Sequence, residues 1–329
     1  MPDATIRDVA RRARVSVASV SRALNGFENV SEQTRARVAD AVKDLGYVPH
    51  AGARSLSLAR SNAIGVVLPD LYGEFFSEIV RGMDSEASRR GYLLLLSNLH
   101  GRKQQAALAL QAMRGRVDGL LVMAPQLSES ELAQGLPARL PVLLINTRTQ
   151  DGGRPSLHLD NAAGARAVVE HLVQLGRKNL VHIAGPVGNM DAQERSDAFY
   201  EACAKHGIRC EIVPGDFTEE SGAAAIEAFL HEGRRFDGIF AANDNMAIGA
   251  LGVLRSAGLR VPQDVAVAGF DDIPLARHLG LTTVRVRIAE LGERAIVRLL
   301  DIIGEVDDGG DELHAPELIA RASTDQGKI

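Results

Sequence analysis

Residues 4–25 read ATIRDVARRARVSVASVSRALN, and this stretch determines how the N-terminal part of the chain folds. It contains two helical patterns, at residues 6–13 and 17–24, which are separated by a tight turn. Thr5 precedes the first pattern, and Asp8 follows Thr5 by three residues, which is the spacing of a capping box. The stretch therefore predicts two short helices that begin at defined caps.

The second helical pattern has the features of a DNA-recognition helix. Ser16 is placed to cap its start and Gly26 to end it. A third pattern follows at residues 32–45, with Ser31 as its cap. Two short helices joined by a tight turn are typical of a helix-turn-helix, whose second helix enters the major groove of DNA. We expect such a three-helix domain over residues 1–48.

The side chains available on this head suit contact with DNA. Arg22 can bond bidentately to guanine or hold a phosphate, whereas Val17 and Ala18 can make apolar contact with a thymine methyl group. The polar side chains suited to the phosphate and sugar backbone, together with the helix caps, are Thr5, Ser16, Ser21, Asn25, Ser31, Thr34 and Tyr47. The alternative is an ordinary three-helix packing unit with a solvated arginine face.

The charge distribution agrees with a head that meets phosphate. Residues 1–60 carry ten basic and six acidic side chains, whereas the rest of the chain carries 27 basic and 36 acidic ones. The net charge of −5 therefore hides a basic head on an acidic body. Such a head favours a nucleic-acid partner, and such a body does not.

Cysteine usage and hydropathy indicate a cytoplasmic protein. Cys203 and Cys210 are seven residues apart and lack the spacing of a redox motif or a metal site, so we expect reduced thiols, no metal and no cofactor. The N-terminus lacks an apolar run of the signal-peptide kind, and no apolar stretch reaches transmembrane length. We therefore expect no membrane partner.

The pattern changes after the head to apolar runs that alternate with helical stretches. Near-continuous apolar strands between helices are typical of parallel sheets covered on both faces. The number of runs predicts an α/β fold with two doubly wound lobes. The runs are AIGVVLPD (63–70), YLLLLSN (92–98), GLLVMAP (119–125), PVLLIN (141–146), LHLDN (157–161), LVHIAG (180–185), GIFAAND (238–244) and VAVAGFDD (265–272).

These patterns divide the chain into three parts. Residues 1–48 form the head, residues 49–61 a hinge that we expect to be helical only with outside help, and residues 62–329 the core. We expect the first lobe to comprise residues 62–161 and 291–325, and the second lobe residues 162–290.

Leu56 in the hinge is a large apolar residue with little core to bury it. It either enters the minor groove as a wedge or covers the base of the core.

The head motifs resemble those of the LacI/GalR family of bacterial transcriptional regulators. The matching motifs are TIRDVA (5–10), VSVASVSRALN (15–25), VSEQTR (30–35), LGYVP (45–49) and ARSL (53–56). The resemblance implies a homodimer on a pseudo-palindromic operator in double-stranded DNA. It also implies that the hinge around Ala53 and Leu56 folds on DNA, with Leu56 entering the central base step.

The core resembles the periplasmic-binding-protein-like core of the same family. Its matching motifs include LPD (68–70), VDGLLV (117–122), LDNAAG (159–164), ANDNMAIG (242–249) and GFDD (269–272). The resemblance implies that a small effector binds between the lobes, at the carboxyl ends of the strands. The side chains expected there are Asp70, Phe75, Phe76, Asn98, Asn146, Arg195, Phe217, Asn243 and Asp271.

The expected function is that of a repressor of carbohydrate-utilisation genes. Aromatic rings suit the C–H face of a sugar, and the amide, carboxylate and guanidinium groups suit its hydroxyls. A purine effector or a phosphorylated carrier protein are alternatives within the family. Outside it, a solute-binding receptor stays open. We expect no enzyme activity, although Asp271 and Asp272 are adjacent carboxylates; they lie at a strand end, where neighbouring side chains diverge.

Overall fold

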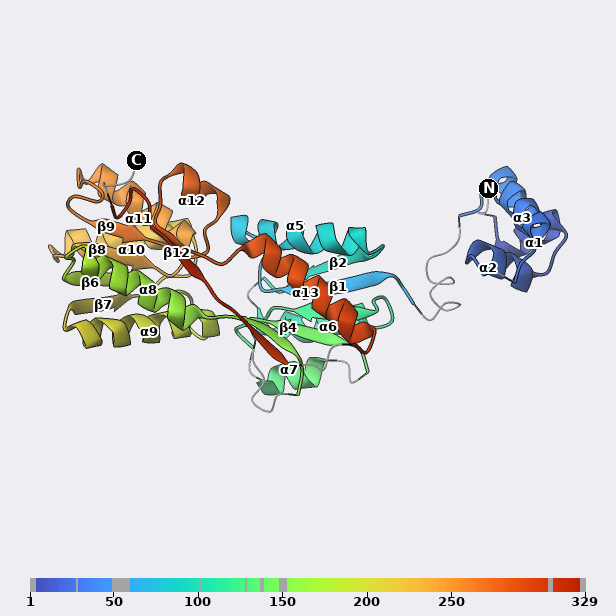
Figure 1. Cartoon of the computed structure of the whole chain (residues 1–329), viewed down its shortest axis with the longest axis horizontal. Helices are drawn as coiled ribbons and strands as arrows, with labels where there is room; N and C mark the ends of the chain where they lie inside the picture. Colours follow the sequence, from blue (N-terminus) through green and yellow to red (C-terminus); the bar gives the residue numbers. More distant parts are fainter. Residues whose placement is uncertain are drawn as a thin grey trace. The chain divides into compact units, whose positions relative to one another are not determined.

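The computed structural model describes residues 4–27, 29–48, 60–100, 102–127, 129–136, 139–147, 153–306 and 310–325. It contains two compact units, an N-terminal head and a larger core, and each is described here by itself (Figure 1). The expectations for Ala53 and Leu56 in the hinge lie outside the described residues.

The head consists of three helices with the predicted bounds. They are α1 (Ile6–Ala13), α2 (Val17–Leu24) and α3 (Glu32–Leu45). The predicted capping box is present, because the Thr5 hydroxyl accepts a hydrogen bond from the Asp8 backbone N–H and an Asp8 carboxylate oxygen accepts one from the Thr5 N–H, at 3.0 Å. Arg14 adopts a left-handed conformation, with φ of 55°, at the turn between α1 and α2.

A small apolar core holds these helices together. Val9, Val20 and Val38, one from each helix, are fully buried or nearly so, and alanines from the same helices fill the space between them. Burial of such side chains stabilises the unit by roughly 1.5–3 kcal/mol for each valine. The head therefore has its own core, which fixes the orientation of α2 relative to α1 and α3.

The first lobe of the core is built on a six-stranded sheet. Its strand order is β11-β5-β4-β3-β1-β2, and the pairs β1–β3, β3–β4, β4–β5 and β5–β11 are parallel. The strands are β1 (Ala63–Leu68), β2 (Leu93–Asn98), β3 (Gly119–Val122), β4 (Val142–Ile145), β5 (Ser156–Leu159) and β11 (Asp311–His314). The helices are α5 (Glu74–Arg89), α6 (Lys103–Met113), α7 (Glu129–Gly135) and α13 (Ile288–Ile303).

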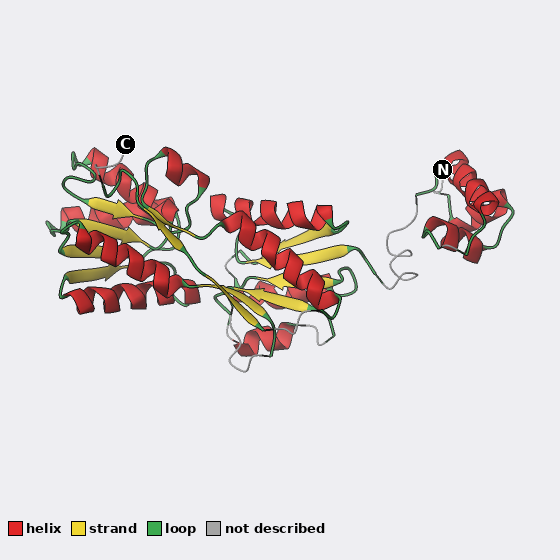
Figure 2. Cartoon of the chain, viewed as in Figure 1, coloured by secondary structure: helices red, strands yellow, loops and turns green. Residues whose placement is uncertain are grey.

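The second lobe is built on a four-stranded parallel sheet with the order β7-β6-β8-β9. Helices and strands alternate in both lobes (Figure 2), as predicted for two doubly wound sheets. The strands are β6 (Asn179–Ile183), β7 (Arg209–Val213), β8 (Gly238–Ala241) and β9 (Ala266–Ala268). The helices are α8 (Asn161–Gln174), α9 (Met190–His206), α10 (Glu219–His231), α11 (Asp244–Ser256) and α12 (Pro274–His278).

The end of the chain differs from the expectation that residues 291–325 all belong to the first lobe. After β11 the chain crosses to the second lobe, where β12 (Glu317–Ile319) pairs antiparallel with β10 (Thr283–Arg285). The Ser323 carbonyl then accepts a hydrogen bond from the Val267 N–H of β9. The two extended segments of the tail are short and only partly apolar, so no periodic pattern marked them. The chain therefore passes between the lobes three times.

Among the described residues, none of the helices has the length and apolar character needed to cross a membrane.

Close packing of α10 against α11 gives a test of the second lobe. A Cβ added to Gly249 in α11 would lie 2.0 Å from the carbonyl oxygen of Glu219 in α10, whereas one added to Gly252 would meet nothing within 4 Å. We expect Gly249→Ala to lower the free energy of unfolding by about 1–3 kcal/mol, since two backbones must separate. Urea unfolding measures this change. Gly252→Ala is the matched control, and equal effects of the two substitutions would contradict the packing argument.

Candidate functional site

The head presents α2 with its predicted reading face exposed. Val17, Ala18 and Arg22 are exposed, and the Arg22 guanidinium donates from Nε to the Ala18 carbonyl at 3.3 Å. Ser21 and Asn25 are half-buried on the same helix. The structure thus brings the predicted base-reading side chains to one surface of one helix.

The predicted backbone-contacting residues fall into two groups. Thr5, Ser16 and Ser31 are exposed N-caps, and Thr34 accepts a hydrogen bond from the Ser31 hydroxyl at 3.0 Å. The exposed hydroxyl groups of these caps are suited to hydrogen bonds with phosphate oxygens. Tyr47 differs from the expectation, because its side chain is 9% exposed and packs in the apolar core of the head. Its ring is needed for packing, which leaves little of it to meet DNA.

In the core, a cavity of about 310 Å³ opens where strands of both lobes end. Its walls come from segments that follow β1, β3, β4, β6, β7, β8 and β9, so both sheets contribute their carboxyl ends. Such edges are the usual ligand sites of doubly wound sheets. Eight of the nine predicted side chains line it, namely Asp70, Phe75, Phe76, Asn146, Arg195, Phe217, Asn243 and Asp271.

Asn98 is the predicted residue that does not line the cavity. It lies at the end of β2, and its Nδ2 donates to Asp70 Oδ1 at 3.3 Å. The same carboxylate oxygen accepts the backbone N–H of Leu71 at 2.7 Å. Asn98 therefore positions Asp70 rather than forming part of the wall.

Aromatic rings form the apolar part of the wall. The rings of Phe75 and Phe76 pack edge to face with centroids 5.3 Å apart, at the start of α5. Phe217 extends from the other lobe, and its ring lies against Gly185, where an added Cβ would come within 2.4 Å of the ring. A glycine at position 185 therefore leaves room for the Phe217 ring in the wall of the cavity. These surfaces suit the C–H face of a sugar or a planar ring.

Arg195 supplies the positive charge of the cavity. It is buried on α9, and its Nε donates to Asn161 Oδ1 at 2.9 Å and its Nη1 to the Ala242 carbonyl at 2.5 Å. Its guanidinium carbon lies 3.7 Å from the centre of the Phe270 ring. Asp271 Oδ1 is 3.9 Å from Nη1. A buried charge needs such partners, and together they fix the guanidinium in one orientation.

The carboxylates around Arg195 titrate abnormally. Burial raises the pKa of Asp271 to about 7, although the Arg195 charge opposes the shift. Burial likewise raises the pKa of Asp191 to about 6, and Arg195 again opposes it. Asp271 has a φ of 113°, in the left-handed region, so the backbone is strained where its side chain meets the cavity. Asp272 accepts hydrogen bonds from Arg285 and Arg321 instead, so the adjacent carboxylates have different partners.

Asn243 has a structural role as well as a place in the wall. Its Oδ1 accepts the Met246 N–H at 3.0 Å and caps α11, and its Nδ2 donates to the Phe217 carbonyl at 2.9 Å. Both interpretations of Asn243, as a cap and as a lining residue, therefore apply to the same side chain.

Sequence reasoning missed several lining residues. Gln126 lies four residues beyond the end of β3, and both polar atoms of its amide are buried without a hydrogen-bond partner among the described residues. Its position just beyond the run GLLVMAP was the available signal. Asp191 lies eight residues beyond β6, at the start of α9. The other polar ones are Tyr72, Asn189, Asp216, Thr218 and Asn245. Among the described residues, no group of three His, Cys, Asp or Glu is placed to hold a metal ion.

Comparison with known proteins gives matches along the whole chain. Residues 5–50 match the lacI family of bacterial regulatory proteins, and residues 169–324 match a periplasmic binding protein-like domain. The HTH-type transcriptional repressor CytR of Escherichia coli K12 is 34% identical over 331 residues, which cover 98% of this chain and 96% of CytR.

Two solved structures are similar as well. The Lac repressor dimer bound to operator and the anti-inducer ONPF has a TM-score of 0.88 and 30% identity, with 98% of this chain and 99% of that one covered. The complex of the transcriptional regulator CelR with cellobiose has a TM-score of 0.72 and 30% identity, covering 97% of this chain and 99% of that one.

The pH dependence of stability tests the burial of Asp271. Its pKa of about 7 in the folded core exceeds the roughly 3.9 of an unfolded chain. Between these values the folded protein keeps a proton that the unfolded chain has released. This group therefore makes the free energy of unfolding fall as pH rises, by at most about 1.4 kcal/mol per pH unit.

Asp271→Asn removes this titration, and asparagine tolerates the positive φ. We expect the stability of the variant relative to the native protein to increase from pH 4 to pH 7 and then to level off. Urea unfolding of both proteins across this range measures the difference. A difference that does not change with pH would contradict the raised pKa of Asp271.

Proposed function

Because this chain belongs to the LacI family of bacterial regulatory proteins, we propose that it represses transcription and that a small sugar between its lobes controls its affinity for operator DNA. The observation that carries the proposal is that both lobes direct predicted ligand-binding side chains into one cavity, in a chain whose head has an exposed recognition helix. We divide the chain accordingly into a DNA-binding domain (1–48), a hinge (49–61) and an effector-binding core (62–329).

A sugar suits the mixture of surfaces in the cavity. Phe75, Phe76 and Phe217 offer aromatic faces, and Arg195 and Asp271 lie close enough to bond two neighbouring hydroxyls. The similarity to CelR, which was solved with cellobiose, supports a carbohydrate. The cavity would hold the ligand without turnover, because Asp271 and Asp272 do not face one another as an acid and a base.

The lobes meet around the cavity, which gives the ligand a means of control. The Leu275 N–H of α12 donates to Glu74 Oε2 of α5 at 3.0 Å, and the Met190 N–H donates to the Pro125 carbonyl at 3.3 Å. Both hydrogen bonds join one lobe to the other. A ligand that favours one degree of lobe closure by about 1–3 kcal/mol is sufficient to shift operator occupancy.

A second copy of the chain would cover an edge of the first lobe. Strand β2 lies at the edge of the six-stranded sheet, and Leu93, Leu95 and Leu96 are exposed on it, Leu93 by 71%. Exposed apolar edge strands promote association. We propose that β2 and the adjacent α5 form a homodimer face, so that two heads read two half-sites of a pseudo-palindromic operator. The similarity to the Lac repressor dimer supports this arrangement.

Operator binding tests the role of α2. We expect Arg22→Ala to weaken binding to the operator by about 10- to 100-fold, since a bidentate contact with guanine contributes about 1–3 kcal/mol. Fluorescence anisotropy with the chain's own upstream DNA, at near-physiological salt and with and without a panel of sugars, measures both affinity and release. We expect one sugar to release the native protein.

Lys43→Ala is the matched control for Arg22→Ala, because it removes one positive charge from the last turn of α3.

In the same titration Leu56→Ala should weaken operator binding far more than binding to random DNA, if Leu56 wedges into a base step. Equal losses on both DNAs would contradict the wedge. Native binding no tighter than to random DNA would contradict the repressor function.

Gln126 gives a test of the cavity that separates binding from folding. Its buried amide lacks a protein partner among the described residues, so removing it relieves a cost of about 1–3 kcal/mol instead of breaking a contact. We expect Gln126→Ala to leave the ligand-free protein as stable as before, or more so, and to weaken effector affinity about tenfold. Thermal unfolding and calorimetric titration with the releasing sugar measure the two effects.

Gln193→Ala is the control for this substitution, because Gln193 is exposed on α9 and bonds to Asp197 at 2.7 Å. Unchanged effector affinity in Gln126→Ala, or a large loss of stability, would exclude Gln126 from the ligand site.

A further inference from the structure

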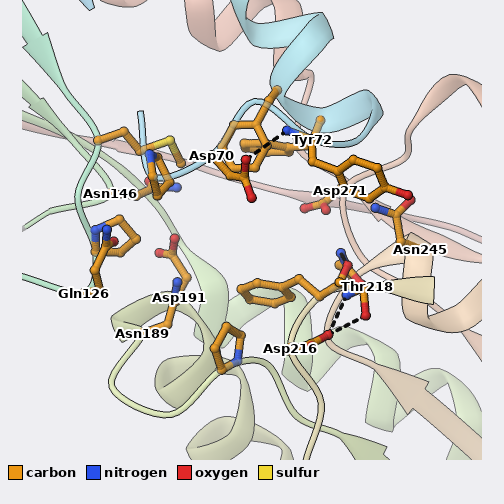
Figure 3. A pocket seen from close by; sticks show the side chains of 18 of the residues that line it. Asp70, Tyr72, Gln126, Asn146, Asn189, Asp191, Asp216, Thr218, Asn245 and Asp271 are labelled. Atoms are coloured by element: carbon orange, nitrogen blue, oxygen red, sulfur yellow. Dashed lines mark hydrogen bonds between the residues drawn. The ribbon is translucent and has the colours of Figure 1, made fainter. Parts of the chain in front are cut away.

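The walls of the cavity carry an excess of negative charge. Four aspartates, Asp70, Asp191, Asp216 and Asp271, face a single cation, Arg195. Lysine and histidine are absent from the described residues that line it. The carboxylates of Asp70, Asp191 and Asp271 point toward the same space (Figure 3). Any ligand in this space therefore meets several carboxylates and one guanidinium that already has partners.

Asp191 is held beside Arg195 by one amide. Asn161 donates from Nδ2 to Asp191 Oδ1 at 2.8 Å and to Glu194 Oε2 at 2.9 Å, and its Oδ1 accepts Arg195 Nε at 2.9 Å. Asp191 is only 8% exposed, so this arrangement holds it in place. With Asp271 on the other side, the guanidinium is outnumbered by the acidic groups around it.

The helix ends at the cavity do not restore a positive field. The helices α9, α10 and α11 begin there, and each has a side-chain cap, since Asn189, Thr218 and Asn243 accept the Ala192, Ser221 and Met246 N–H groups, respectively. The helix α5 also begins there; its N-cap Gly73 has no side chain to accept a hydrogen bond, and Glu74 lies in its first turn. Acidic residues in the first turns of α5, α9 and α10, namely Glu74, Asp191 and Glu219, oppose the dipoles of these helices. Anion binding at a helix start relies on N–H groups and a dipole that are not already matched.

We propose that Asp191, together with Asp271 around a single arginine, restricts the effector to hydroxylated compounds without an anionic group, so that phosphorylated sugars and nucleotides are rejected. This inference rests on the proposed function, because it concerns the effector of the same cavity. A phosphate adds about −1.5 to −2 charges at neutral pH, and here it would enter a partly open cavity beside carboxylates. Like charges brought together in such a site cost several kcal/mol.

The charges that face Asp191 are Arg195 and Glu194 on α9, Asp271 after β9, Asp70 after β1 and Asp216 after β7. Burial raises the pKa of Asp191 to about 6 and that of Asp271 to about 7. At pH 8 both carboxylates are therefore ionised, and this is the pH at which the rejection of anions is best measured.

Matched ligand pairs test the proposal with the full-length protein. Calorimetric titration at pH 8 compares ribose with ribose 5-phosphate, glucose with glucose 6-phosphate, cellobiose with cellobiose 6-phosphate, and cytidine and adenosine with their monophosphates. We expect an uncharged member to bind and its phosphorylated partner to bind at least about 100-fold more weakly. In Asp191→Asn the ratio between the affinities for the uncharged and the phosphorylated ligand should fall about tenfold.

Asp197→Asn is the matched control, because it removes the same charge from an exposed position of the same helix. It should leave the gap between paired ligands unchanged. If a phosphorylated member binds as tightly as its partner, the charge restriction is overturned while the effector function stands. If the gap persists in Asp191→Asn, Asp191 is not its cause. If no compound binds and operator affinity never responds, the effector function itself fails, and this inference fails with it.

Discussion

The cleft of this regulator depends on one buried cation. Arg195 sits in the interior of the second lobe, where an unpaired charge costs several kcal/mol. Interactions of the guanidinium offset this cost, and its partners are the Asn161 amide, the Ala242 carbonyl, the Phe270 ring and the Asp271 carboxylate. These partners come from α8, from the end of β8 and from the segment after β9. The charge therefore aligns the parts of the second lobe that form its side of the cavity.

The two lobes add different chemistry to this cavity. The first lobe contributes Asp70, the Phe75–Phe76 pair and the unpartnered amide of Gln126, all just beyond strand ends. The second contributes the guanidinium and most of the carboxylates. Because three segments of the chain join the lobes, the movement of one lobe relative to the other is restricted to opening and closing about these connections. A ligand that contacts both walls can therefore change how far the lobes close, and this change can be transmitted to the rest of the protein.

Local patterns predicted the head more accurately than the core. The three helices of the head begin and end at the predicted residues, because the caps Thr5, Ser16 and Ser31 and the turn after Ala13 are local signals. The packing of the Tyr47 side chain in the core of the head was not predicted, since its burial depends on three helices meeting. The crossing of the tail to β10 was missed because its short strands are specified by pairing partners distant in the sequence.

The sequence by itself determined the class of fold, the alternation of strands and helices, and eight of the residues that line the cavity, out of nine predicted. This was possible because strand ends and helix caps are specified by residues that are adjacent in the sequence. Only the tertiary structure decided that Asn98 supports Asp70, that the Gln126 amide has no partner among the described residues, and that Asp191 shares Asn161 with Arg195. These facts depend on which side chains from separate elements meet in a low-dielectric interior, and burial there also sets the charge of the site.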